Sequence, residues 1–202
     1  PLRRQRQMCI RDRVFVIIIS FSSDQSIQMY GYRFMPREWT VGAYTYLWML
    51  QDWLGTAFLV SVGTTVVGTV LGLLLNATMG YALSRTSFAL RRFLTIVIFI
   101  PMLFNGGLVA SYMVNTQLLD LGNTYWALIL PLAVSSFHIV ILRTFFQTTI
   151  PEEVIESARI DGASQFRIFF SIVLPLSLPA LATVGLFLSF AYWNSWFPAL
   201  LY

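Results

Sequence analysis

Residues 53–84 read WLGTAFLVSVGTTVVGTVLGLLLNATMGYALS and contain no Asp, Glu, Lys or Arg. A helix needs roughly 20 residues to cross about 30 Å of hydrocarbon, and this stretch is longer than that. A helix is the expected form, because lipid offers the backbone no hydrogen-bond partner and the stretch lacks the alternation of a barrel strand. The sequence has three further uncharged stretches, at 93–119, 121–142 and 168–202. It therefore predicts four spans, near 54–76, 93–113, 125–146 and 178–199.

The composition of the whole chain agrees with a membrane protein. Of its 202 residues 57% are hydrophobic and 11% are charged, and the mean hydropathy is +0.70. A soluble domain of this length could not bury so much apolar surface, and disorder requires the opposite composition. The single Cys (Cys9) and single His (His138) exclude a disulfide framework and a Cys- or His-rich metal site.

The positions of the arginines predict the orientation of the spans. All 13 basic residues are Arg, and they lie in segments 1–13, 85–92 and 143–167 except for Arg33 and Arg37. If the chain crosses alternately, those three segments share one side, which the positive-inside rule assigns to the cytoplasm. Loops 22–52 and 114–123 are then expected to face outward.

The two ends of the sequence are abrupt. The apolar run 14–21 is too short to span and is interpreted as the outer end of a helix whose beginning is missing. Residues 1–13 are polar and rich in Arg, and two interpretations stay open, a cytosolic tail or a translation artefact joined to a gene fragment. The chain stops at Tyr202, where the last predicted span emerges.

The segment between the third and fourth predicted spans, residues 143–177, does not resemble a linker. Pro151 fits the first position of a helix, and Glu152 and Glu153 complement the positive end of its dipole. Gly162 stands where a helix would end in the left-handed conformation. An apolar side is predicted from Val154, Ile155, Ala158 and Ile160, and a second amphipathic stretch from Phe166, Phe169, Phe170 and Ile172. Pro175 and Pro179 are expected to break the chain before the last span.

This segment resembles the EAA loop of ABC-importer permeases. Glu156-Ser157-Ala158, Gly162 and Ile172-Val173-Leu174-Pro175 match the family spacing, with Ser157 in place of the first Ala. Further stretches are similar to the carbohydrate branch, the maltose-permease-like second permeases: ESARIDGAS (156–164), NGGL (105–108), SSFHIVILRTFF (135–146), LPLSLPALAT (174–183) and AYWNSWFPALLY (191–202).

The resemblance covers residues 14–202 and implies an all-α polytopic membrane protein with the type I importer permease fold. Such permeases usually have six spans, so this chain would hold a remnant of the first and then spans two to five. The sixth span would be missing, and the chain would be a fragment.

The resemblance also implies partners and a coupling site. The machine would combine two permeases, two ATP-binding cassette subunits and an extracytoplasmic sugar-binding protein in the bacterial cytoplasmic membrane. Residues 151–162, within a cytoplasmic loop at 147–177, would be a coupling helix docked on the ATPase. The residues expected to couple are Glu152, Glu153, Glu156, Ala158, Asp161 and Gly162. The alternative is a capped surface helix with no partner.

The substrate pathway is predicted from polar and aromatic residues in the spans. Aromatic faces stack on sugar rings, amides bond hydroxyls, and uncharged spans suit a neutral solute. The candidates are Asn105, Ser135, His138, Tyr192, Trp193, Asn194 and Trp196. The aromatic residues could equally form an interfacial belt, and a single His more often makes a hydrogen bond between helices. The stripe of Ser61, Thr65, Gly68 and Gly72 is interpreted as close helix packing.

Catalysis finds no support in the sequence. There is no phosphate-binding Gly-rich loop and no Lys, so ATP hydrolysis is expected on a separate subunit, and no cofactor or metal is predicted. Nucleic-acid binding is not expected, because the arginines flank the spans. The predicted function is that of an ATP-driven carbohydrate importer permease. The alternatives are a permease for a phosphate ester or peptide, an integral-membrane enzyme, and an ion-driven secondary transporter.

Overall fold

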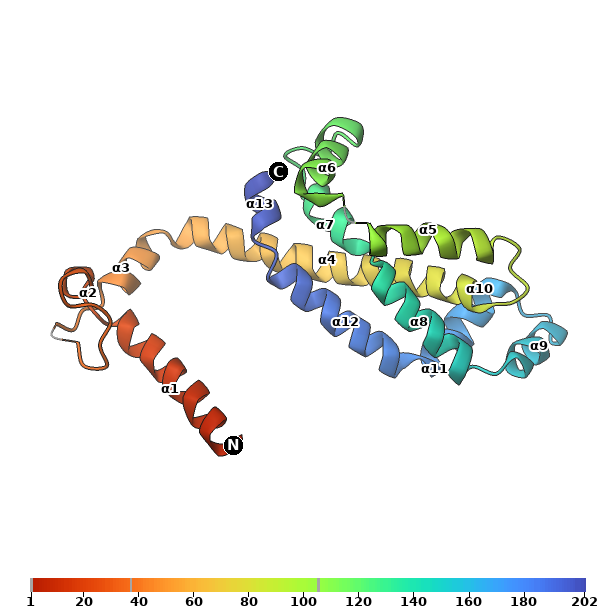
Figure 1. Ribbon diagram of the computed structural model, residues 1–202, viewed down its shortest axis with the longest axis horizontal. Helices are drawn as coiled ribbons and strands as arrows, with labels where there is room; N and C mark the ends of the chain where they lie inside the picture. The colour runs from red at the N-terminus through yellow and green to blue at the C-terminus, as the bar shows by residue number, and fades with distance from the viewer. Residues whose placement is uncertain (1, 37, 105) are drawn as a thin grey trace. The chain divides into compact units, whose positions relative to one another are not determined.

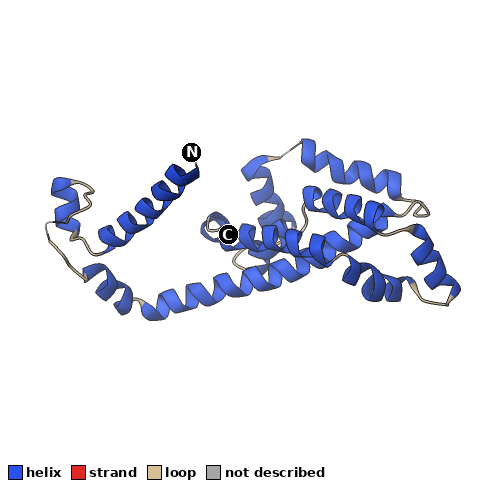
Figure 2. Ribbon diagram, turned by 90° about the horizontal axis from the view of Figure 1, so that it is seen from below, coloured by secondary structure: helices blue, strands red, loops and turns tan. Residues whose placement is uncertain are grey.

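The computed structural model describes residues 2–36, 38–104 and 106–202. Over these ranges the regular structure is helical, as Figure 2 shows, and Ser22 and Trp39 form an isolated antiparallel bridge. The chain divides into two compact units, residues 1–59 and 60–202, and the boundary falls within the long helix α4 (Gln51–Ser84). The predicted all-α class is confirmed.

The first unit contains α1 (Leu2–Ser20), α2 (Asp24–Tyr30), α3 (Gly42–Met49) and the beginning of α4. Helix α1 includes both the Arg-rich segment and the apolar run, which the sequence had separated. The turn after α1 is held by a hydrogen bond in which the Thr40 amide donates to the Phe21 carbonyl at 2.9 Å. The Phe21 ring also packs on Tyr44, with ring centroids 5.0 Å apart.

The second unit contains the rest of α4 and the helices that follow it in the chain (Figure 1). Buried residues of α4, α5 and α8 form one apolar cluster, and α4, α8 and α12 share another. The elements are α5 (Arg91–Leu103), α6 (Gly107–Met113), the π-helix η1 (Val114–Leu118), α7 (Tyr125–Ala133), α8 (Ser136–Thr149), α9 (Glu152–Ile160), α10 (Gln165–Ile168), the π-helix η2 (Phe169–Val173), α11 (Leu174–Leu176), α12 (Leu178–Trp193) and α13 (Phe197–Leu201).

Three of the four predicted spans correspond to helices that are long and apolar enough to cross a membrane. Among the described residues α4 passes that test alone. Two bent pairs pass it together: Tyr125–Ala133 with Ser136–Thr149, bent by 46°, and Gln165–Leu176 with Leu178–Leu201, bent by 82°. The described part of the chain therefore provides up to three crossings by length and composition.

The span predicted at 93–113 is not one continuous helix. Helix α5 ends at Leu103 and α6 begins at Gly107, whose φ of +77° is incompatible with a continuing right-handed helix. Pro101 lies inside α5, before the interruption, and cannot donate a backbone hydrogen bond. The span 93–113 is thus not one helix, and the interruption that the sequence NGG at 105–107 indicated, with Pro101 as the alternative cause of a kink, lies between α5 and α6.

The small-residue stripe of α4 brings other helices close to its backbone. A Cβ on Gly68 would lie 2.6 Å from Cε1 of Tyr192, and one on Gly72 would lie 3.0 Å from the Ala133 carbonyl oxygen. Gly80 continues the contact, because a Cβ there would lie 3.1 Å from that of Leu142. The prediction that Gly68 and Gly72 serve close helix packing is confirmed.

Candidate functional site

Helix α9 (Glu152–Ile160) is the predicted coupling helix, and local chemistry determines both of its ends. Pro151 is the N-cap, with a ψ of 145°, and not the first helical residue as the sequence predicted. The helix starts one residue later because Pro151 keeps an extended backbone. Glu152 and Glu153 lie in the first turn, as expected, and Arg159 lies in the last turn, where a cation complements the dipole.

The C-terminal end of α9 is a Schellman motif. The Ala163 amide donates to the Ala158 carbonyl at 3.0 Å, and the Gly162 amide donates to the Arg159 carbonyl at 3.0 Å. Gly162 has a φ of +78°, so the predicted left-handed termination is confirmed. A Cβ at Gly162 would meet no atom within 4 Å, so a substitution there strains only the backbone.

The two faces of α9 have opposite chemistry. Ile155 and Ala158 are buried in the apolar cluster that also contains Phe146 of α8 and Phe169 of η2. Ala158, which was expected on the apolar side of the coupling helix and at a position of close packing, packs against this chain's own core. Ile160 was expected on the apolar side but is 86% exposed, because it projects from the opposite face of the last turn.

The acidic residues of α9 are exposed and differ in their surroundings. Glu153 and Glu156 lie on the outward face, and Asp161 is the exposed C-cap residue. Glu152 instead turns toward the connection between α4 and α5, where its Oε1 accepts a long hydrogen bond from the Thr86 hydroxyl at 3.5 Å. The exposed surface of α9 therefore carries acidic side chains together with Arg159, and its apolar elements are Val154 and Ile160.

Tyr192 is the most enclosed of the predicted pathway residues that the structure describes. It lies in α12, is 4% exposed, and its hydroxyl donates to the Ile129 carbonyl of α7 at 2.7 Å. Its ring covers Gly68 of α4. Tyr192 therefore joins three helices.

The other candidates in this part of the chain lie near the end of α12. Trp193 is half-exposed, and Trp196 is exposed and edge-on to Phe197 with ring centroids 5.6 Å apart. Asn194 is the C-cap of α12, and its Nδ2 donates to the Phe190 carbonyl at 2.8 Å. The Asn194 amide thus completes the end of its own helix and keeps its oxygen for other contacts.

The remaining pathway candidates come from α8 and the interrupted span. Asn105 lies outside the described residues. His138 stacks on Phe187 of α12 with ring centroids 6.4 Å apart, and within the described chain its Nδ1 is buried without a hydrogen-bond partner. Its observed contact with another helix is therefore aromatic. Ser135 is the N-cap of α8, and its backbone amide donates to Oδ1 of Asn76 at 3.1 Å.

Asn76 is a residue that the sequence interpretation missed. It is fully buried in α4, and its Nδ2 donates to the carbonyls of Gly72 at 2.6 Å and Ala133 at 2.7 Å. Together with the bond from Ser135, these contacts satisfy the backbone groups left open where α7 stops and α8 starts. Its signal in the sequence is a lone Asn inside an uncharged apolar run.

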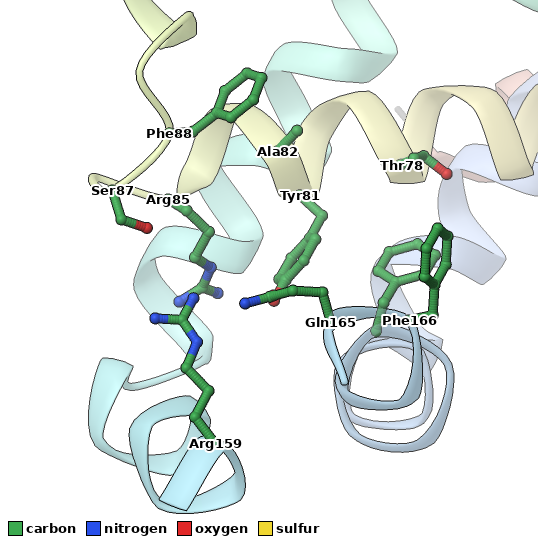
Figure 3. A pocket seen from close by; sticks show the side chains of 10 residues that line it. Thr78, Tyr81, Ala82, Arg85, Ser87, Phe88, Arg159, Gln165 and Phe166 are labelled. Atoms are coloured by element: carbon green, nitrogen blue, oxygen red, sulfur yellow. The ribbon is translucent and has the colours of Figure 1, made fainter. Parts of the chain in front are cut away.

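A cavity at the end of α4 was also missed. It has a volume of about 320 Å³, and its walls come from α4, the following turn, α9 and α10 (Figure 3). Arg85 and Arg159 both extend into it, and Arg85 lies over the Tyr81 ring with its Cζ 5.1 Å from the centroid. Burial lowers the pKa of Arg85 from its ordinary value, while the nearby Tyr81 and Glu152 act in the opposite direction.

The sequence of this chain matches the model of a known protein family. The family model described as "Binding-protein-dependent transport system inner membrane component" matches residues 64–198. The chain belongs to this family. The resemblance to ABC-importer permeases is thereby confirmed. Among the described residues no group of three His, Cys, Asp or Glu could hold a metal.

Two relatives of this chain are permeases with carbohydrate names. The polygalacturonan/rhamnogalacturonan transport system permease protein YtcP of Bacillus subtilis (strain 168) is 40% identical over 195 residues, which are 96% of this chain and 67% of YtcP. The arabinooligosaccharides transport system permease protein AraQ of Halalkalibacterium halodurans is 30% identical over 183 residues, which are 89% of this chain and 65% of AraQ.

A solved structure shows the same fold. It is the crystal structure of a bacterial ABC transporter involved in the import of the acidic polysaccharide alginate. The match has a TM-score of 0.82 at 27% identity and covers 96% of this chain and 69% of the other. The predicted type I importer permease fold is confirmed, and the chain spans about two thirds of the length of these relatives.

Proposed function

We propose that this chain forms part of the translocation path of an ATP-driven carbohydrate importer and couples through α9 to a separate ATPase subunit. The observation that carries the proposal is the two-faced, capped helix α9. Its inward residues Ile155 and Ala158 join the core of the crossings, and its outward residues Glu153 and Glu156 are exposed to a partner.

The mechanical argument follows from packing. Because Ile155 is 1% exposed and lies in one cluster with Phe146 of α8 and Val184 of α12, a shift of α9 displaces those helices as well. Packed cores switch between discrete arrangements and do not deform continuously, so movement of a docked ATPase would reach the crossings. The importer also needs a second permease and an extracytoplasmic binding protein. Because the ATPase binds from the cytoplasm, α9 lies on that side of the membrane.

The cargo follows from the relatives and from the absence of charge in long stretches of the crossings. YtcP, AraQ and the alginate importer carry carbohydrate names. Residues 53–84 and 168–202 contain no charged side chain, which suits a solute recognised through hydroxyls and ring faces. Uptake of labelled oligosaccharides, with glycerol phosphate and a peptide as competitors, tests this part. Competition by either of those instead of by sugars would contradict it.

Site-directed cross-linking tests the coupling role. In a background with Cys9 replaced by Ser, Glu156→Cys is expected to capture the ATPase subunit through a thiol-to-amine reagent in intact cells. Leu118→Cys in η1 is the matched control, because Leu118 is also exposed (78%) but belongs to the loop predicted to face outward. Capture at both positions, or at neither, would refute the assignment.

A backbone substitution gives a second test of coupling. Gly162→Ala places a Cβ at a φ of +78° without any steric contact, so the local cost is about 1–2 kcal/mol. Folded membrane proteins with about 5–15 kcal/mol of stability tolerate that loss. We expect normal insertion but weaker retention of the ATPase, whereas Gly122→Ala in the opposite loop is expected to retain it.

A further inference from the structure

The cavity between α4, α9 and α10 contains a buried positive charge that is not compensated. Arg85 is 8% exposed, and its Nε and Nη2 are buried without a hydrogen-bond partner in the described structure. The Tyr81 hydroxyl beside it is also buried and unpartnered there. A buried guanidinium is costly unless an anion and hydrogen bonds accompany it, so this pair of donors indicates a missing acceptor.

A second guanidinium makes the charge imbalance larger. Arg159 extends from α9 toward Arg85 in Figure 3, and the two like charges disfavour one another. Turning the Gln165 amide over lets its oxygen accept from Nε and Nη2 of Arg159 at 3.0 and 2.9 Å, which orients this side chain. Glu152 is the neighbouring acid, but its carboxylate bonds Thr86 and forms no ion pair with either arginine in the described residues.

The walls of the cavity suit an amphiphile better than a small soluble ion. Beyond the two arginines the lining is mainly apolar and aromatic, with Phe88 on the turn after α4 and Phe166 and Phe169 on the α10 side. Phe166 is 78% exposed, so this wall continues to the outer surface of the helix pair. A phosphate held by the arginines could therefore extend its hydrocarbon along these rings.

The surrounding surface is also basic. A neighbouring hollow of about 450 Å³ shares Phe88 and is lined by Arg91, Arg92 and Arg143. The Nε of Arg143 is buried and lacks a partner among the described residues. Arginine clusters at the cytoplasmic end of crossings attract the anionic lipids of that leaflet.

We propose that the cavity lined by Arg85 and Arg159 binds the phosphate group of an anionic phospholipid of the cytoplasmic leaflet. The two guanidiniums hold the phosphate oxygens by charge-assisted hydrogen bonds, the Tyr81 hydroxyl donates a further bond, and the aromatic wall contacts the acyl chain. The proposal rests on the orientation proposed above, with α9 in the cytoplasm. Because Arg159 belongs to α9 and Arg85 directly follows α4, the bound lipid would join the coupling helix to the end of a crossing.

Native mass spectrometry of the full permease in its purified transporter tests the proposal. The complex is equilibrated with phosphatidylglycerol or phosphatidylcholine, and the lipids retained per permease are counted. We expect one tightly retained phosphatidylglycerol that phosphatidylcholine does not replace. Arg85→Gln and Arg159→Gln should each weaken its retention about 10-fold, the effect of losing one charge-assisted contact.

Two controls separate the explanations. Arg167→Gln is the matched control, because Arg167 is an exposed arginine of α10 outside the cavity, and it should retain the lipid like the wild type. Arg159 is itself exposed, so its replacement should leave folding intact, which a thermal melt of the same sample verifies. Equal retention by the wild type, Arg85→Gln and Arg159→Gln would overturn the proposal.

Competition with inorganic phosphate distinguishes the source of the anion. If millimolar phosphate displaces the bound phosphatidylglycerol, the site takes a soluble phosphate and the lipid assignment is overturned. ATPase retained in the same preparation reports separately on the proposed coupling. Loss of the ATPase with lipid retention unchanged would contradict the proposed function while leaving the lipid site in place.

Discussion

Asn76 supports the break between α7 and α8, and replacing it by Leu tests how much that support contributes. Leu is close to Asn in shape but removes the donor to the Ala133 carbonyl at 2.7 Å and the acceptor of the Ser135 amide at 3.1 Å. Losing the hydrogen bond to the Gly72 carbonyl should cost the least, because that carbonyl also accepts a backbone hydrogen bond within α4. The other two groups become buried and unsatisfied at a cost of about 1–3 kcal/mol each.

The expected destabilisation is therefore about 2–5 kcal/mol, after allowance for the apolar gain of Leu. That is a large part of a typical stability of about 5–15 kcal/mol, so the midpoint of unfolding should move clearly. Denaturant unfolding of the purified transporter measures the loss. Hydrogen exchange at the Ser135 amide locates it, because that group loses its acceptor.

Thr64→Val is the matched control. Thr64 also lies in α4, but its hydroxyl bonds only carbonyls of its own helix, those of Val60 at 2.9 Å and Ser61 at 3.1 Å. Its replacement should change the free energy of unfolding by less than about 0.5 kcal/mol. If Asn76→Leu proves no more destabilising than Thr64→Val, or if exchange at Ser135 is unchanged, Asn76 does not hold the break.

Three further outcomes follow from the packing around α12. Gly68→Ala should destabilise the fold by about 1–3 kcal/mol, because its Cβ would displace the Tyr192 ring. Gly63→Ala is the control, because a Cβ there meets no atom within 4 Å, and it should be neutral or stabilising by up to about 1 kcal/mol. The unfolding midpoints of the two variants give the comparison. Tyr192→Phe keeps the ring over Gly68 but removes the hydroxyl that donates to the Ile129 carbonyl. We expect the free energy of unfolding to fall by about 1–2 kcal/mol and the substrate affinity to stay unchanged. A change in substrate affinity without a change in stability would indicate a direct role in the pathway. His138→Phe should preserve stability within about 1 kcal/mol, because the observed contact of the ring with Phe187 is aromatic stacking; a larger loss would reveal a hydrogen bond through Nε2.

The features that could be predicted from the sequence are those governed by local chemistry. Uncharged length places α4 and the last crossing, because the hydrocarbon thickness sets a minimum number of apolar residues. The end of α9 follows from Gly162, since only a residue tolerant of positive φ completes its Schellman motif. The start was displaced by one residue, because Pro151 is compatible with both a cap and a first turn.

The features that were missed depend on residues far apart in the chain. The break before α8 requires Asn76 to supply both a donor and an acceptor across helices, and an isolated Asn does not reveal its partners. Likewise Arg85 and Arg159 were interpreted only as orientation signals. Their meeting in one cavity follows from how α9 folds back onto the end of α4.

The structure places rigid and bendable parts where a coupled importer would need them. The apolar cluster that contains Ile155 of α9 also contains residues of α8 and α12, so these elements respond as one body. The 46° bend between α7 and α8 lies at the edge of that body, whereas the 82° bend before α12 lies within it, since Val173 and Ala180 both belong to the cluster. At the first bend the side chain of Asn76 replaces the backbone bonds that a continuous helix would have made, so reorientation there does not expose unsatisfied groups to lipid. A push on α9 would therefore be converted into a change of angle at the bend between α7 and α8, which is how a short docked helix can alter access at the far end of the crossings.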